Sequence, residues 1–105
     1  MKQYQIILVN LDPTIGSENR KTRPCMVISP DEMNKYLRTV VIAPMITSSK
    51  NYPTRIEVKH DNKIGWIVLD QIRTIDKQRI LRPLGRLSKP EIKEVKSFIT
   101  EIFVA

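Results

Sequence analysis

Hydrophobic residues in this chain occur mostly as short runs, and polar stretches that hold proline, glycine or asparagine separate one run from the next. Runs of this length that are rich in β-branched residues and bounded by turn residues are typical of β-strands. The pattern predicts strands over residues Tyr4–Leu11, Pro24–Ser29, Thr39–Ile46, Thr54–Lys59, Ile64–Leu69 and Arg79–Leu87. The stretch between the last two, Asp70–Asp76, is expected to be short and irregular.

Clear helical periodicity appears at the end of the chain. Ser88 and Glu91 have the spacing of a capping box, and Pro90 falls in the first helical turn. Apolar residues then recur at helical spacing and are expected to pack on the core: Ile92, Val95, Phe98, Ile99, Ile102 and Phe103. A single helical turn is expected at Pro30–Asn34. These elements predict a mainly β (α+β) fold, a small partly open barrel of about five to seven strands with a C-terminal helix.

Length and composition limit the class of protein. The chain has 105 residues, 41% of them hydrophobic, so residues 1–105 are expected to form one folded domain. No apolar run is long enough to span a membrane, and the N-terminus leads directly into a strand pattern without a signal peptide. The one cysteine, Cys25, has no partner for an internal disulfide, which favours a reducing cytoplasm.

The charge is strongly positive and unevenly distributed. The formal net charge is +7, and the segment from Arg73 to Lys96 holds eight basic and three acidic residues. A field of this kind attracts polyanions, so nucleic acid is the favoured class of partner, although many basic proteins bind no polyanion.

Most familiar catalytic arrangements are missing from the sequence. Neither a P-loop nor a dinucleotide-binding glycine motif is present, and the carboxylates lack metal-ligand spacing, so we expect no metal and no cofactor. His60, the one histidine, is expected in a solvated turn, and Cys25 is expected to be a buried structural thiol.

Polar side chains at strand ends remain as candidates. The polar loop Pro13–Thr22 leads to Arg23, which stands just before a buried strand, and Thr47, Ser48 and Ser49 place three hydroxyls after another strand. A fixed arginine can present a fork of donors to a phosphate, and a hydroxyl can orient a reacting oxygen. Each feature alone is more typical of a surface residue or a turn.

Three linked motifs resemble one known family. The segments LDPTIGSENRKTRPCMVIS, VVIAPMITSS and WIVLDQIRTID, followed by GRLS before the closing helix, are similar in order and spacing to the MazF/PemK toxins of bacterial toxin–antitoxin modules. The resemblance implies an SH3-like barrel that forms a homodimer. It also implies a sequence-selective endoribonuclease (an mRNA interferase) that cuts single-stranded RNA without metal and leaves a 2′,3′-cyclic phosphate and a 5′-hydroxyl.

The resemblance assigns roles to individual positions. It places the two catalytic residues on Arg23 and Thr47, and supporting residues on Glu18, Ser48, Asp70 and Gln71. One branch of the family has a histidine before the loop acid and an arginine two residues before the DQ pair, where this chain has Ser17 and Val68. The chain therefore supports the version of the mechanism that uses arginine and threonine.

The RNA is expected to lie on the basic face of the molecule. The residues expected to contact it are Asn19, Lys21, Lys50, Arg73, Arg79, Arg82 and Arg86. Tyr36, Tyr52 and Trp66 are candidates for stacking on bases, with core packing favoured for Trp66.

The family resemblance implies a cognate acidic antitoxin as a second partner. Two other functions fit the same fold. One is a non-catalytic SH3-like module that binds RNA, and the other is a relative that poisons a DNA topoisomerase by protein contact. Arg23 and Thr47 favour the ribonuclease, because a topoisomerase poison needs neither.

Overall fold

The computed structural model describes residues 1–11, 22–60 and 62–104. The strands in these ranges are β1 (Gln5–Asn10), β2 (Thr22–Val27), β3 (Thr39–Ile46), β4 (Arg55–His60), β5 (Lys63–Val68), β6 (Arg73–Asp76) and β7 (Ile80–Arg86). The helices are α1 (Asp31–Tyr36) and α2 (Lys89–Phe103), with short 3-10 turns η1 (Leu69–Gln71) and η2 (Lys77–Arg79). None of these helices is long and apolar enough to cross a membrane.

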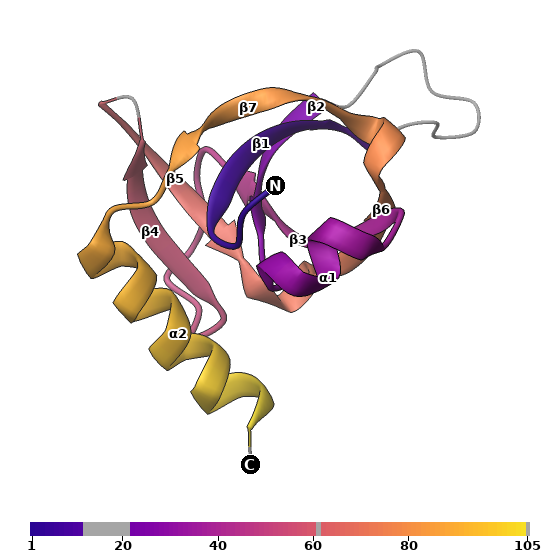
Figure 1. Cartoon of the computed structure of the whole chain (residues 1–105). Coiled ribbons are helices and arrows are strands. Elements are labelled where there is room, and N and C mark those ends of the chain that lie inside the picture. Colours follow the sequence, from indigo (N-terminus) through magenta and orange to yellow (C-terminus); the bar gives the residue numbers. More distant parts are fainter. Residues whose placement is uncertain (12–21, 61, 105) are drawn as a thin grey trace.

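The strands form one antiparallel sheet that curls on itself (Figure 1). The order along the sheet is β4-β5-β3-β2-β1-β7, and β6 pairs with β3 beside this path. β1 and β7 arch over one end, and α2 lies along β4 (Figure 1). The predicted mainly β fold, a partly open barrel with a C-terminal helix, is confirmed.

β3 is the central strand of the sheet. One of its sides pairs with β2, where Cys25 lies opposite Pro44. Its other side pairs first with β6, over Thr39 to Ile42, and then with β5, over Met45 and Ile46. These partners bury most of β3, as its apolar sequence predicts.

The prediction of an irregular segment at Asp70–Asp76 is wrong for its second half. Arg73–Asp76 forms β6, with Ile75 buried opposite Val40. The strand has only four residues, one of them buried, which is too little for a periodic signal to stand out from the neighbouring turns.

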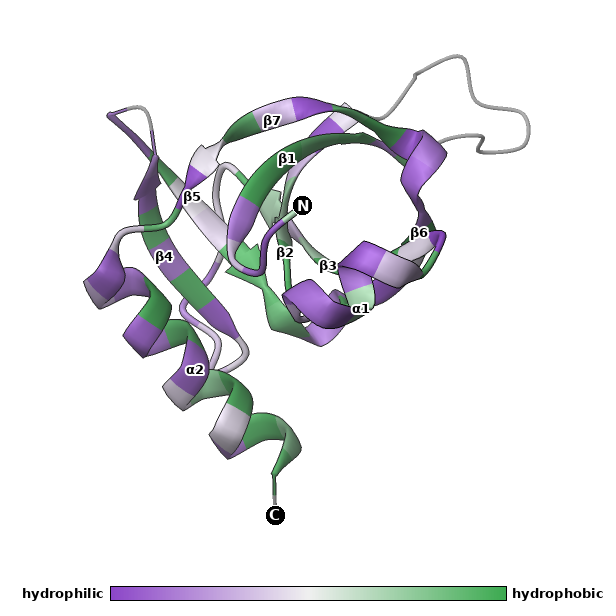
Figure 2. Ribbon diagram, in the orientation of Figure 1, coloured by the Kyte–Doolittle hydropathy of each residue, from purple (hydrophilic) through white to green (hydrophobic). Residues whose placement is uncertain are grey.

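Two hydrophobic clusters lie on the two faces of the curled sheet. One, which includes Ile6, Met26 and Ile67, packs against α2 through Val95. The other, which includes Val9, Cys25 and Ile42, is enclosed by β1, β2, β3 and β6. Hydrophobic and hydrophilic residues alternate along β4 and α2 (Figure 2), which is the pattern of elements with one buried face.

The capping box predicted for the closing helix is confirmed. The Ser88 side chain accepts a hydrogen bond from the Glu91 backbone N–H, and the Glu91 carboxylate accepts one from the Ser88 N–H. Glu91 Oε2 also accepts a bond from the Lys59 backbone N–H at 2.8 Å. The N-terminus of α2 is therefore hydrogen-bonded to the end of β4.

The single helical turn predicted at Pro30–Asn34 is present as α1.

Candidate active site

A pocket of about 370 Å³ brings together the two residues that the sequence singled out as catalytic. Arg23 comes from the start of β2, and Thr47 follows the end of β3. The residues that line the pocket are Thr22, Arg23, Pro24, Met45, Ile46, Thr47, His60, Lys63, Ile64, Gly65 and Leu84. Much of the lining is apolar, so the few polar groups in it are partly shielded from water.

Antiparallel pairing of β2 with β3 explains why Arg23 and Thr47 meet. Cys25 lies opposite Pro44, and the same register continued by two residues places Arg23 opposite Ile46, the residue before Thr47. Arg23 is half-buried and Thr47 is exposed. A guanidinium held by a strand beside an accessible hydroxyl is suited to bind a phosphate and orient one of its oxygens.

The pKa of the Cys25 thiol is affected by two nearby positive charges. Burial raises the pKa of its thiol to about 12, while the charges of Arg23 and Arg73 oppose that rise. The thiol is fully buried, and its sulfur donates to the Arg23 carbonyl oxygen at 3.6 Å. The prediction of a buried structural cysteine is confirmed. The charges of Arg23 and of Arg73, on β6, thus both act on this thiol.

The expectation that His60 is solvated in a turn is wrong. His60 is the last residue of β4, is half-buried, and lines the pocket with Arg23 and Thr47. Its ring lies against Gly85, where a β-carbon would come within 2.9 Å of the imidazole Cε1. The alternation of Ile56 and Val58 continues to His60, and this signal could have placed its side chain on the inner face.

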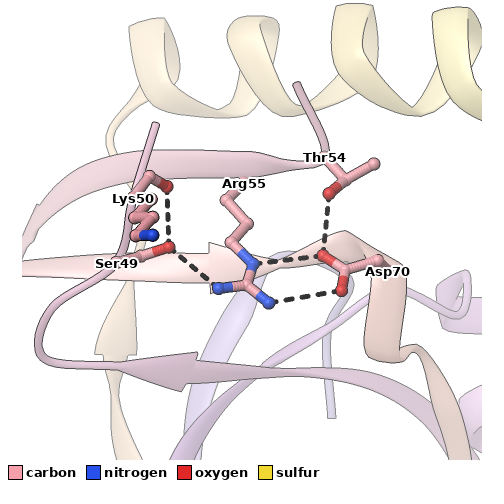
Figure 3. Close-up of polar contacts among 5 residues, drawn as sticks. All are labelled: Ser49, Lys50, Thr54, Arg55 and Asp70. Carbon is pink, nitrogen blue, oxygen red and sulfur yellow. Dashed lines mark hydrogen bonds and ion pairs between the residues drawn. The ribbon is translucent and has the colours of Figure 1, made fainter. Parts of the chain in front are cut away.

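Asp70 lies outside the pocket and belongs to a different cluster (Figure 3). Arg55 donates from Nε to Asp70 Oδ1 at 3.3 Å and from Nη2 to Oδ2 at 3.4 Å. The Thr54 hydroxyl donates to the same Oδ1 at 2.8 Å. These bonds, that of Arg55 above all, hold the pKa of the Asp70 carboxyl below its usual range. Sequence spacing gave no sign that Arg55 would be its partner.

The other predicted residues are dispersed. Ser48 directly follows Thr47 but does not line the pocket, and Gln71 is exposed at the end of η1. Arg79 is half-buried and donates to the Asn10 carbonyl oxygen at 3.3 Å. Exposed basic residues of the predicted RNA-contacting set are Lys50, Arg73, Arg82 and Arg86. Glu18, Asn19 and Lys21 lie outside the described residues, as does most of the predicted loop Pro13–Thr22.

Within residues 1–11, 22–60 and 62–104, no three His, Cys, Asp or Glu side chains lie close enough together to hold a metal ion. The polar side chains that line the pocket are those of Thr22, Arg23, Thr47, His60 and Lys63.

Comparison with known protein families identifies the family of this chain. Residues 2–103 match the model of the PemK-like, MazF-like toxins of type II toxin–antitoxin systems. The chain belongs to this family. The resemblance inferred from the three sequence motifs is thus confirmed.

Known MazF proteins are similar to this chain in sequence and in fold. An endoribonuclease MazF from Staphylococcus saprophyticus subsp. saprophyticus is 35% identical over 105 aligned positions, with 94% of this chain and 88% of the relative covered. A MazE–MazF crystal structure from Deinococcus radiodurans has a TM-score of 0.83 at 22% identity, with 97% and 94% of the two chains covered. A mycobacterial endoribonuclease in complex with its cognate antitoxin has a TM-score of 0.80 at 17% identity, with 96% and 92% covered.

Proposed function

We propose that this family member is a toxin that cuts single-stranded RNA, with Arg23 and Thr47 as its catalytic residues and no metal. The observation that carries the proposal is that both residues line one pocket. The relative that is 35% identical is named an endoribonuclease, which supports the same activity.

In the proposed reaction the ribose 2′-hydroxyl attacks the adjacent phosphorus in line. A bond forms between the 2′-oxygen and phosphorus, and the bond from phosphorus to the 5′-oxygen breaks. The products are a 2′,3′-cyclic phosphate and a 5′-hydroxyl. Negative charge grows on the non-bridging oxygens in the transition state, and Arg23, which lines the pocket, is proposed to stabilise it.

Thr47 is proposed to orient the 2′-hydroxyl or to donate to a phosphate oxygen. A free hydroxyl is too weak a base to remove the proton itself, so a second group must accept it. Glu18 is the acceptor expected from the sequence. His60 is an alternative that the structure supplies, because it lines the same pocket and imidazole is the side chain most often used as a general base.

The proposal includes the partners and the place of action. Solved relatives include an endoribonuclease in complex with its cognate antitoxin. We expect an acidic antitoxin to bind the basic surface of this chain, a homodimer to be the active form, and the cytoplasm, where messenger RNA is found, to be the site of action.

The decisive experiment incubates the protein with single-stranded RNA in excess EDTA. We expect cleavage that leaves fragments with 5′-hydroxyl ends, and no cleavage at a bond whose 2′-hydroxyl has been replaced by hydrogen. Loss of activity on chelation that magnesium restores would refute the metal-free mechanism. Binding without cleavage would favour the non-catalytic module, and neither binding nor cleavage would favour the topoisomerase poison.

A further inference from the structure

The connection between β3 and β4 presents an aromatic ring on a rigid support. Tyr52 is 45% exposed, and the Arg55 guanidinium lies 4.9 Å from the centre of its ring. This contact is a cation–π interaction, and it covers part of the ring surface while leaving the rest of the side chain exposed.

The Arg55 guanidinium is held by three hydrogen bonds, to Asp70 on one side and to Ser49 on the other (Figure 3). Asp70 accepts two of its bonds, and Ser49 Oγ accepts a third from Nη1 at 3.0 Å. The Ser49 hydroxyl in turn donates to the Lys50 carbonyl oxygen at 2.8 Å. The Arg55 side chain is only 19% exposed, so these bonds are partly protected from water.

The backbone around Tyr52 is fixed as well. The Tyr52 N–H donates to the Lys50 carbonyl at 2.8 Å, and the Arg55 N–H donates to the Tyr52 carbonyl at 3.1 Å. A ring that is fixed before a ligand arrives loses little conformational entropy on binding, so more of the stacking energy appears as affinity.

We propose that Tyr52, supported by Arg55 and Asp70, is a stacking platform for one unpaired nucleobase of the RNA. Single-stranded nucleic acids are held by aromatic rings on which bases stack, with cations nearby to neutralise phosphates. Lys50, exposed two residues before Tyr52, supplies such a cation. The inference rests on the proposed function for the identity of the ligand and adds a site outside the Arg23–Thr47 pocket.

The register of the sheet places this platform within reach of RNA bound at the pocket. Met45 lies opposite Ile67 of β5, which lies opposite Ile56 of β4. β3 and β4 run in the same direction, because each is antiparallel to β5. Thr47 comes two residues after Met45 and Arg55 one residue before Ile56, so they are three residues apart along the strand direction and two strands apart across the sheet. With strands about 4.8 Å apart and a rise of about 3.3 Å per residue, Thr47 and Arg55 are separated by on the order of 14 Å. Because the Arg55 guanidinium contacts the Tyr52 ring, we expect the base on Tyr52 to belong to a nucleotide close to the cut but not at it.

Tyr36 provides a natural comparison. It is more exposed, at 73%, and the cation near its ring is Lys35, its neighbour on α1. α1 precedes Thr39, the first residue of β3, whereas Thr47 follows the last residue, so Tyr36 lies toward the opposite end of this strand. Tyr36 was also a stacking candidate on the sequence, but its place far from the pocket argues against contact with RNA at the cut, so Tyr36→Ala is the matched control.

The test uses a probe that cannot be cut, a short 2′-O-methyl oligouridylate that carries a single 2-aminopurine. Stacking on the ring should quench the fluorescence of 2-aminopurine when the full-length protein binds. Tyr52→Ala should abolish this quenching and weaken binding by between about 5-fold and about 100-fold, while Tyr52→Phe should behave like the natural protein. Arg55→Met should also weaken binding, because it removes the guanidinium that supports the Tyr52 ring.

Quenching and affinity that survive Tyr52→Ala, or that Tyr36→Ala lowers as much, would overturn the platform. A folding defect is recognised by thermal melting, and if Tyr52→Ala does not fold, Tyr52→Leu, which keeps an apolar side chain but has no ring, should show the same loss of quenching.

A second measurement maps the cut sites on a transcript of known sequence. Tyr52→Ala should lower the cleavage efficiency at every mapped site and leave the base preference unchanged, because an aromatic ring stacks on any base. A cleavage efficiency that is unchanged at every mapped site would count against the platform. A natural protein that does not cut at all would refute the proposed function, and the uncut probe would still decide on the platform.

Discussion

A guanidinium stabilises a phosphate well only when its position is fixed. The backbone of Arg23 is fixed by its place in strand β2. Arg23 is half-buried at the start of β2 and is followed by Pro24, whose ring restricts the backbone. The nearby charge of Arg73 adds to the attraction for an anion. At the scale of the residue, the proposed stabilisation of the transition state therefore depends on a fixed Arg23.

Arg23→Ala should lower the rate of RNA cleavage by about 100-fold or more, on the scale of losing one donor to an oxyanion. The affinity for uncut RNA should fall much less, because other basic residues still neutralise phosphates. Single-turnover rates and binding curves measure the two effects separately. Arg38→Ala, which removes an exposed arginine outside the pocket, is the control. A cleavage rate within a few-fold of the natural one would remove Arg23 from the mechanism.

Thr47→Val keeps the shape of the side chain and removes its hydroxyl. We expect cleavage to fall by about 100-fold while the melting temperature stays unchanged, because Thr47 is exposed. Thr47→Ser should recover much of the rate. Thr74→Val, at an exposed position on β6, controls for the general effect of the substitution. A large drop in melting temperature for Thr47→Val would show a structural role instead.

At the scale of the elements, β7 and β4 are in close contact near their ends, where the backbone of Gly85 packs against the ring of His60. Gly85 has a φ of +138°, a conformation that side-chain-bearing residues rarely adopt, and its Cα faces the His60 imidazole. His60 contributes to the pocket, so this packing couples the backbone of β7 to the candidate site.

Gly85→Ala should destabilise the fold by about 1–3 kcal/mol, because the backbone is strained and the new methyl group collides with His60. The melting temperature should fall accordingly in a thermal scan. Gly65→Ala is the matched control, since its β-carbon would meet Met45 Cε at an ordinary 3.5 Å. Equal melting temperatures for the two variants would contradict the argument.

The Arg55–Asp70 ion pair should make a pH-dependent contribution to stability. The pKa of Asp70 is lowered in the folded state, so the contribution is present above its usual value of 3.8 and is lost as pH falls through the folded value. Both side chains are partly exposed, at 19% and 36%, which limits the effect to less than about 1 kcal/mol.

Asp70→Asn should therefore be slightly less stable than the natural protein at pH 7, and the difference should vanish in strong acid. Urea denaturation at several pH values measures it. Glu101→Gln, at an exposed carboxylate near the end of α2, is the control. A stability difference that persists unchanged at low pH would show that the ion pair is not its cause.

The sequence predicted the elements that repeat a pattern and missed what depends on a contact between distant residues. Thr39–Ile46 and the closing helix were evident from long apolar patterns, and Arg23 and Thr47 from family motifs. β6 was missed because four residues carry little periodicity. Asp70 was expected to support catalysis, yet its partner Arg55 comes from another strand and was not visible in the spacing.

At the scale of the whole molecule, the net charge of +7 is the main source of attraction for RNA. Exposed arginines on β6 and β7 lie outside the pocket, so they can neutralise phosphates of the flanking RNA without touching the cut bond. Binding of this kind releases counterions and weakens as salt rises.

Arg82→Gln should reduce the slope of log affinity against log salt by about 0.7, the value expected for the loss of one phosphate contact on a single strand. The cleavage rate at saturating RNA should stay unchanged. Titrations of an uncleavable RNA at several salt concentrations measure the slope. Lys35→Gln on α1 is the control, and an equal slope for both variants would remove Arg82 from the RNA path.

β7 stands at the end of the sheet, and among the described strands it pairs with β1 alone. An open strand edge invites aggregation, and β7 carries three features that discourage it: Pro83, exposed arginines, and two irregularities in its pairing with β1. The arginines expected to hold RNA therefore also keep the protein soluble. An inactive variant that does not aggregate is therefore better made by replacing Arg23 than by replacing the arginines of β7.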